Sequence, residues 1–302
     1  MTNDNDIDLN ELKLALLNKK FLIASVTSVA AVASIVFALW LPNIYSSQAL
    51  LAPASKEDSL SAKLGSYSSF AGIAGINLPG ETGSKDKEAI ERVKSYDFFV
   101  DQFLPNIKFE DLVAYKRWDQ RKDIIIYDNK VYDKANEKWI RKAKYPKLPK
   151  PSNQEAFKIY KEIFNATVDK KTNFVTLDFE HVSPVIAKLW LDIVIDNINL
   201  HMRDLDMQLA KNSINFLNNA SNETSIAPMR DAISDLLENQ MQILMLADST
   251  TDYVFKSISS PIVTEEKIKP SRAMIVILGT FFGFIFSSLA SLVLHYRDDK
   301  KS

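Results

Sequence analysis

The chain has 302 residues, enough for one or two domains with a sizeable core. Its formal net charge of −1 gives no broad electrostatic attraction to polyanions, so nucleic acid is not expected as a partner. Because it contains no cysteine, the sequence excludes disulfides, thiolate catalysis, lipoprotein attachment and thiolate metal sites.

Two long uncharged segments, 21–41 and 273–294, contain eleven and thirteen Phe, Leu, Ile or Val residues. Each is long enough to cross a hydrocarbon core of about 30 Å, and each such residue favours insertion by about 0.3 to 0.6 kcal/mol. A cleaved signal peptide is disfavoured for the first segment, because its apolar run is long and no A-x-A site is evident. A buried core helix is the alternative for the second. We expect two transmembrane helices.

The flanking charges predict the orientation of these helices. Three lysines precede the first helix and three basic residues follow the second: Lys13, Lys19, Lys20, Arg297, Lys300 and Lys301. We expect a protein of the bacterial inner membrane, and the positive-inside rule then places both termini in the cytoplasm and the bulk of the chain in the periplasm. Lys267, Lys269 and Arg272 lie on the opposite flank and oppose this assignment.

The fold class predicted is an α/β extracytoplasmic base domain with long projecting helices, anchored by an N-terminal and a C-terminal transmembrane helix. The expected divisions are a cytoplasmic tail at 1–20, the first membrane helix at 21–41, the periplasmic base at 42–183, the helical projection at 184–250, a return strand and proline-containing connector at 251–272, the second membrane helix at 273–294, and a cytoplasmic tail at 295–302.

Five of the seven glycines lie between Ser55 and Ser84, which predicts an irregular segment. This segment lacks both G-x-G-x-x-G and G-x-x-x-x-G-K-[ST], so neither nucleotide binding nor any other cofactor is expected.

The expected elements of the base follow in chain order. They are a strand at 44–51, a helix at 86–104, a hairpin at 123–132 turning at Asp128-Asn129, a solvated basic proline-rich connector at 141–151, a helix opened by the capping box of Ser152 and Glu155, and a strand at 174–180.

A long helix dominates the second half of the chain. Ser183 is a suitable N-cap and Pro184 a suitable first residue, and apolar residues then recur at helical spacing as far as Phe216. A polar stretch at 218–225 separates it from a second helix at about 227–247, before a strand at 253–258. At 1.5 Å per residue the first helix is roughly 50 Å long, so it projects from a compact base. Polar residues within the apolar pattern disfavour a strict coiled coil: Asp196, Asn199, Asp204 and Asn212.

The sequence offers no catalytic set. Its histidines, His181, His201 and His295, are far apart in the chain, and lone histidines are more often structural than ligands or bases. No pair of carboxylates stands out for glycoside hydrolysis. We therefore expect neither an enzyme nor a metal site.

Small residues recur every four positions in the second membrane segment: Gly279, Gly283, Ser287 and Ser291. They lie on one helix face, where small side chains allow a second helix to approach closely, so we expect them to pack against another helix. The first membrane segment is one candidate partner, since it carries a looser small face made of Thr27, Ala31, Ser34 and Ala38.

From about residue 10 to about residue 295, the sequence resembles the Wzz-type chain-length determinants, which are class 1 polysaccharide co-polymerases. The segments that carry the resemblance are Leu41-Pro42-x-x-Tyr45-x-Ser47, AGIAGIN at Ala71 to Asn77, Glu91-Arg92-x-x-Ser95 with Phe98-Phe99, DKKTNFVTLDFEHVSP at Asp169 to Pro184, Glu238-Asn239-Gln240 through Leu246-Ala247, Tyr253-Val254-Phe255-Lys256, and Lys269-Pro270-Ser271-Arg272-Ala273 continuing to Leu278-Gly279-Thr280. Ser271 is a departure, because many relatives carry lysine there.

The resemblance implies a non-enzymatic regulator that sets the modal chain length of lipopolysaccharide O-antigen together with a separate membrane polymerase. It implies a ring-shaped homo-oligomer as the assembly. The resemblance makes the O-antigen polymerase a second candidate partner of the small-residue face. It also implies lipid-linked polysaccharide as a partner of the protein.

Other functions stay open. The polymer can instead be another lipid-linked envelope polysaccharide, such as enterobacterial common antigen. A two-helix membrane sensor needs a cytoplasmic output module, and only eight residues follow Leu294. An envelope hydrolase lacks an identifiable acid–base set.

Overall fold

The computed structural model describes residues 17, 19–54 and 85–299, which fall into two compact units. Residues 1–44 and 267–302 form what we call the terminal-helix unit, and residues 45–266 form the central unit. The glycine-rich segment 55–84 lies outside the described residues.

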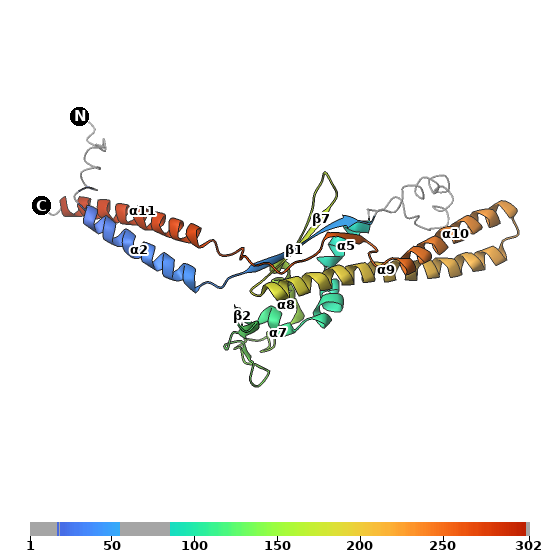
Figure 1. Cartoon of the computed structure of the whole chain (residues 1–302), viewed down its shortest axis with the longest axis horizontal. Coiled ribbons are helices and arrows are strands. Elements are labelled where there is room, and N and C mark those ends of the chain that lie inside the picture. Colours follow the sequence, from blue (N-terminus) through green and yellow to red (C-terminus); the bar gives the residue numbers. More distant parts are fainter. Residues whose placement is uncertain (1–16, 18, 55–84, 300–302) are drawn as a thin grey trace, which may run out of the picture. The chain divides into compact units, whose positions relative to one another are not determined.

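Two long apolar helices make up the terminal-helix unit, α2 at Lys20–Trp40 and α11 at Arg272–Asp299 (Figure 1). Among the described residues they are the two helices long and apolar enough to cross a membrane, with mean hydropathy of 2.3 and 2.2. Only Ala38 is buried in α2, and Phe281, Phe284 and Phe286 of α11 are each more than half exposed. Helices that are apolar all round yet exposed are typical of membrane spans.

An antiparallel four-stranded sheet organises the central unit, in the order β6-β7-β1-β8. The strands are β1 at Tyr45–Pro53, β6 at Phe164–Val168, β7 at Val175–His181 and β8 at Phe255–Ser259. Burial alternates along β7 as its apolar pattern predicts. In the register of β1 with β7, Tyr45 faces His181 at one end and Leu51 faces Val175 at the other.

Aromatic side chains fill the core of this unit. The Phe103 and Phe179 rings stack with centroids 5.5 Å apart, and Tyr160 lies 5.0 Å from Phe103. Trp190 meets Phe179 edge to face at 5.6 Å. The Tyr160 hydroxyl, buried with the rings, donates to the Val93 carbonyl at 3.0 Å. The core thus joins the sheet to helices from three parts of the chain.

One of these parts corrects the helix expected at 86–104. Helix α5 covers Lys85–Val93, and then come the short α6 at Tyr96–Phe98, a π-helical turn at Phe99–Phe103 and a 3₁₀ turn at Leu104–Asn106. The single helix was wrong because Ser95 adopts an extended conformation and its side chain accepts from the Phe98 amide at 3.2 Å. This local hydrogen bond restarts the helix in place of continuing it.

The hairpin expected at 123–132 was also wrong in its pairing. After α7 at Phe109–Val113, strand β2 at Tyr115–Asp119 pairs with β3 at Ile124–Tyr127. Strand β4 at Tyr132–Asp133 pairs instead with β5 at Lys138–Trp139. Asp128 does form a turn, since its carbonyl accepts from the Val131 amide at 2.8 Å, but this turn links two different hairpins. The charged residues of β2 obscured its strand pattern.

The elements around the long helix follow their local signals. Helix α8 at Asn153–Ile163 begins with the predicted capping box of Ser152 and Glu155. Helix α9 covers Pro184–Glu223, forty residues and about 60 Å, with the Ser183 hydroxyl accepting from the Ile186 amide. It continues through the polar residues 218–223, since no glycine or proline interrupts them. Helix α10, at Ala227–Ser249, packs back against α9 (Figure 1).

The two halves of α9 differ in their surroundings. Nine of its eleven buried residues lie between Pro184 and Met202, where it contacts β1 and β7. Beyond Met202 only Ala210 and Leu217 are buried. The distal half of α9 therefore extends past the core. The structure confirms the predicted fold class, a mixed α/β unit with a long helix and two terminal apolar helices.

Candidate functional site

The small-residue face of α11 lies against α2 within the terminal-helix unit. Gly279 faces Ser34, Gly283 faces Ala30 and Thr27, and Ser287 again faces Thr27. Along this contact the residue numbers increase in α11 as they decrease in α2, so the two helices pack antiparallel.

Both glycines are sites of close approach. A Cβ atom built on Gly279 would lie 1.9 Å from Ser34 Oγ and 2.7 Å from Ser34 Cβ. One built on Gly283 would lie 2.4 Å from Ala30 Cβ. Real Cβ atoms do not come this near to other heavy atoms, so any larger residue forces the helices apart or moves the facing side chain. This close packing gains dispersion energy that lipid cannot replace.

The serines of the face are buried as well. Ser287 is 1% exposed and Ser291 fully buried. The Ser287 and Thr27 hydroxyl oxygens are 3.3 Å apart, a hydrogen bond across the pair, and Ser287 also donates to the Phe284 carbonyl at 2.9 Å. Ser291 Oγ has no hydrogen-bond partner among the described residues. The pair is thus held mainly by packing.

Arg272 connects the two helices at one end. Its Nε donates to the Ala38 carbonyl at 3.2 Å and its Nη2 to Asn43 Oδ1 at 3.0 Å. Ala38 lies in the last turn of α2, where the backbone carbonyls have no hydrogen-bond partner within the helix. A positive charge at this position also interacts favourably with the negative end of the helix dipole. Next to it, Ile44 forms an antiparallel bridge with Lys269. The sequence had suggested only a flanking charge at Arg272, so its bridging role was missed.

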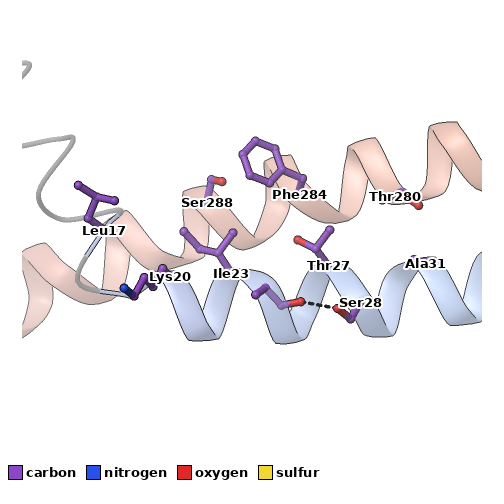
Figure 2. A pocket seen from close by; sticks show the side chains of 10 residues that line it. Leu17, Lys20, Ile23, Thr27, Ser28, Ala31, Thr280, Phe284 and Ser288 are labelled. Carbon is purple, nitrogen blue, oxygen red and sulfur yellow. Dashed lines mark hydrogen bonds between the residues drawn. The ribbon is translucent and has the colours of Figure 1, made fainter.

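A groove of about 620 Å³ runs beside the helix contact (Figure 2). Its lining comes from Leu17, Lys20, Ile23, Ala24, Thr27, Ser28, Ala31, Thr280, Phe284 and Ser288. Lys20 is the one charged residue in this lining, and the exposed groove surface is mostly apolar. The groove can hold an apolar chain, but it presents no acid, base or nucleophile in a reactive arrangement.

His181 is buried in the central unit and serves its structure. Its Nδ1 accepts from the Ser183 amide at 3.1 Å, and its Nε2 lies 3.0 Å from the Asp111 carbonyl, to which it donates in the neutral tautomer. Burial lowers the pKa of His181 to about 4, so the ring is neutral near pH 7. Both nitrogens are occupied, which leaves neither free for catalysis.

His201, the other histidine whose side chain the structure describes, lies near the surface of the central unit. His201 lies with its ring centroid 6.3 Å from that of Phe98, beside a surface depression that also contains Glu88, Arg92 and Asp101. Arg92 pairs there with Glu88 at 2.7 Å. Across the described residues, no group of three or more His, Asp or Glu side chains can hold a metal ion. The side chain of His295 lies outside the described part of the chain.

Asn199 is a structural residue that the sequence pattern did not predict. Its Oδ1 accepts from the amides of Val254 and Phe255, both at 2.9 Å, and its Nδ2 donates to the Phe255 carbonyl at 3.1 Å. The side chain therefore binds α9 to the start of β8. In a heptad pattern an asparagine at this position only disfavours a coiled coil. The pattern cannot indicate the backbone groups that bind Asn199, because they lie more than fifty residues away in the sequence.

The comparison with protein families matches the first part of the chain. Residues 5–97 match the family model "Wzz: Chain length determinant protein". No match was found among curated proteins.

Two solved structures are similar at low identity. A full-length bacterial polysaccharide co-polymerase is 12% identical, with 97% of this chain and 99% of that chain covered at a TM-score of 0.40. A fragment of WzzB, a polysaccharide co-polymerase from Salmonella Typhimurium, is 13% identical, with 75% and 100% covered at a TM-score of 0.33. The family match spans α2, β1 and α5, and over these residues the chain is similar to the chain length determinant proteins.

Proposed function

We propose that the protein is a non-enzymatic regulator that sets the modal chain length of lipopolysaccharide O-antigen, acting with a separate membrane polymerase. The observation that carries this proposal is the chain length determinant match over residues 5–97. The paired apolar helices support it, because a regulator of a polymerase in the membrane needs a membrane anchor.

The topology that goes with this function has both termini in the cytoplasm and the central unit in the periplasm. Lys19 and Lys20 at the start of α2 support this orientation under the positive-inside rule. Reporter fusions near Ser152 should then report the periplasm and fusions at either end the cytoplasm. A cytoplasmic signal at Ser152 would contradict the orientation.

The second part of the proposal is that the protein works as a homo-oligomer and that its α2–α11 contact is needed for this activity. The close approach at Gly279 and Gly283 supports that part, since it gives each protomer a defined membrane anchor.

Deletion of the gene tests the function directly. Lipopolysaccharide gels of the deletion strain should still show polymerised O-antigen, but with a broad length distribution, and the wild-type gene should restore the modal band. Complete loss of polymer would identify an essential enzyme. An unchanged O-antigen profile with altered enterobacterial common antigen would assign the regulator to that polymer.

A further inference from the structure

A strongly basic region stands out on the central unit. Residues 108–151, which we call the basic lobe, contain thirteen Lys and Arg but seven Asp and Glu, a net charge of +6 in a chain whose total is −1. The lobe comprises α7 and the two hairpins β2–β3 and β4–β5.

Several acids of the lobe accept hydrogen bonds within its own turns. Asp119 accepts from the Arg121 amide at 3.0 Å, Asp123 from Trp118 Nε1 at 2.8 Å, and Asp133 from the Asn136 side chain at 2.8 Å. Most of its lysines and arginines are instead exposed. Among the described residues, the lobe's ion pairs are those of Arg141 and Lys147 with Glu155 of α8. The exposed surface of the lobe therefore carries its excess of positive charge.

The β2–β3 hairpin of the lobe lies at one defined end of the sheet. The Trp118 ring packs edge to face on Tyr45, with ring centroids 5.7 Å apart. Tyr45 begins β1, and residues 41–44 alone connect it to α2. A fully extended link from Trp40 to Tyr45 reaches about 17 Å at most. The hairpin thus packs at the end of the sheet where the chain continues, through residues 41–44, into an apolar helix.

The β6–β7 hairpin provides an internal contrast. Its turn carries Lys170 and Lys171, adjacent and exposed like Arg121 and Lys122 in the β2–β3 turn. The strand register puts this turn beyond Leu51, at the far end of β1 from Tyr45. The two hairpins therefore present the same charge at opposite ends of one strand.

We propose that the β2–β3 hairpin of the basic lobe binds the anionic phospholipid headgroups of the membrane that α2 and α11 span. The inference rests on those helices being membrane spans, as the proposed function requires. Ile124, 42% exposed beside Arg121 and Lys122, adds apolar contact at the interface. In the connector of the same lobe, Tyr145 is 97% exposed and has lysines near it in the sequence. Tyrosine is enriched at membrane interfaces. Each basic residue near an anionic bilayer strengthens binding to its surface, and it raises the equilibrium constant for binding about fivefold.

The test uses the cysteine-free full-length chain in lipid nanodiscs, so that a single introduced cysteine is labelled uniquely. An environment-sensitive fluorophore is placed on Ile124→Cys, with Val168→Cys beside the β6–β7 turn as the matched site, since Val168 is 38% exposed. Nanodiscs of phosphatidylcholine alone are compared with nanodiscs containing phosphatidylglycerol. The label at position 124 should report an apolar environment and be quenched by doxyl lipids in the anionic discs, whereas the label at 168 should stay in water.

Neutralising the charges completes the test. Arg121→Gln with Lys122→Gln should weaken the bound state roughly thirtyfold, as expected for two charges at an anionic surface. Lys170→Gln with Lys171→Gln should have no effect. Equal responses of the two labels, or equal effects of the two charge pairs, would overturn the proposal. So would docking that requires a lipid-linked polysaccharide in place of phosphatidylglycerol. Because no readout depends on polymer length, the result stands apart from the deletion experiment.

Discussion

The two units of this chain are stabilised in opposite ways. In the terminal-helix unit, glycine, alanine and serine allow two backbones to approach, and adding atoms at Gly279 or Gly283 produces contacts below 3 Å. In the central unit, large rings such as Phe179 and Trp190 fill the interior, and removing atoms leaves cavities. The difference follows from the solvent. Lipid gives little reward for burying apolar surface, whereas water gives a large one.

The largest effect is expected from adding volume in the terminal-helix unit. Gly279→Leu with Gly283→Leu should leave membrane levels normal, because the segment becomes more apolar, yet abolish the α2–α11 contact. We expect loss of modal length control on lipopolysaccharide gels at wild-type abundance. Val293→Leu, which introduces a leucine at an exposed position of α11, is the control. An unchanged length distribution in the double variant would show that this face has no function.

A swap of small residues distinguishes α2 from the polymerase as the functional partner. Gly283→Ala adds a methyl group against Ala30, and Ala30→Gly removes the methyl group that it meets. The pair of substitutions should therefore restore whatever the single substitution loses. Failure to restore it would assign the face to another helix.

Removing a buried polar group should have the largest effect in the central unit. Asn199→Leu leaves two amides and one carbonyl near Val254 and Phe255 without partners, at about 1 to 3 kcal/mol each. The free energy of unfolding should fall by about 4 kcal/mol, which thermal or denaturant unfolding of the purified protein would detect. Asn212→Leu, an exposed change on the same helix, should be near neutral. Similar losses for both variants would contradict the role of Asn199.

These two regions also show how far the sequence predicts the molecule. Local signals were sufficient for the Ser152 capping box, the start of α9 at Pro184 and the alternating strand β7. Long-range partners were not predictable, because the backbone groups that bind Asn199 and the carbonyl that binds Arg272 carry no residue-specific signal. The pairing of β3 with β2 was missed for a different reason, because the charged residues of β2 obscured its strand pattern. The spacing of Gly279, Gly283, Ser287 and Ser291 indicated a common face, but it did not specify what that face contacts.

Acid should weaken the central unit through His181. Its pKa is about 4 in the folded protein and about 6.5 when unfolded, so the unfolded chain binds the additional proton. This contribution to stability is complete above pH 6.5 and is lost as the pH falls toward 4, by about 2 kcal/mol at pH 5. Unfolding measured from pH 7.5 to 5 should show this slope, and His181→Asn should reduce it. His201→Asn is the control, because that ring is only partly buried. An unaltered slope in His181→Asn would exclude His181 as its source.

The smallest effect is expected from the hydrogen bond across the terminal helices. Thr27→Val keeps the shape of the side chain but removes the hydroxyl that lies 3.3 Å from Ser287 Oγ. Ser287 still donates to the Phe284 carbonyl, so no buried donor loses every partner. We expect a loss of about 0.6 kcal/mol in helix association, typical of hydrogen bonds between membrane helices. Thermal unfolding in nanodiscs should detect little change relative to Ser28→Ala, whose hydroxyl bonds only its own helix at Ala24. The modal length should also persist. Loss of length control in Thr27→Val would show that the hydroxyl, and not the packing of small residues, is the feature on which the helix pair depends.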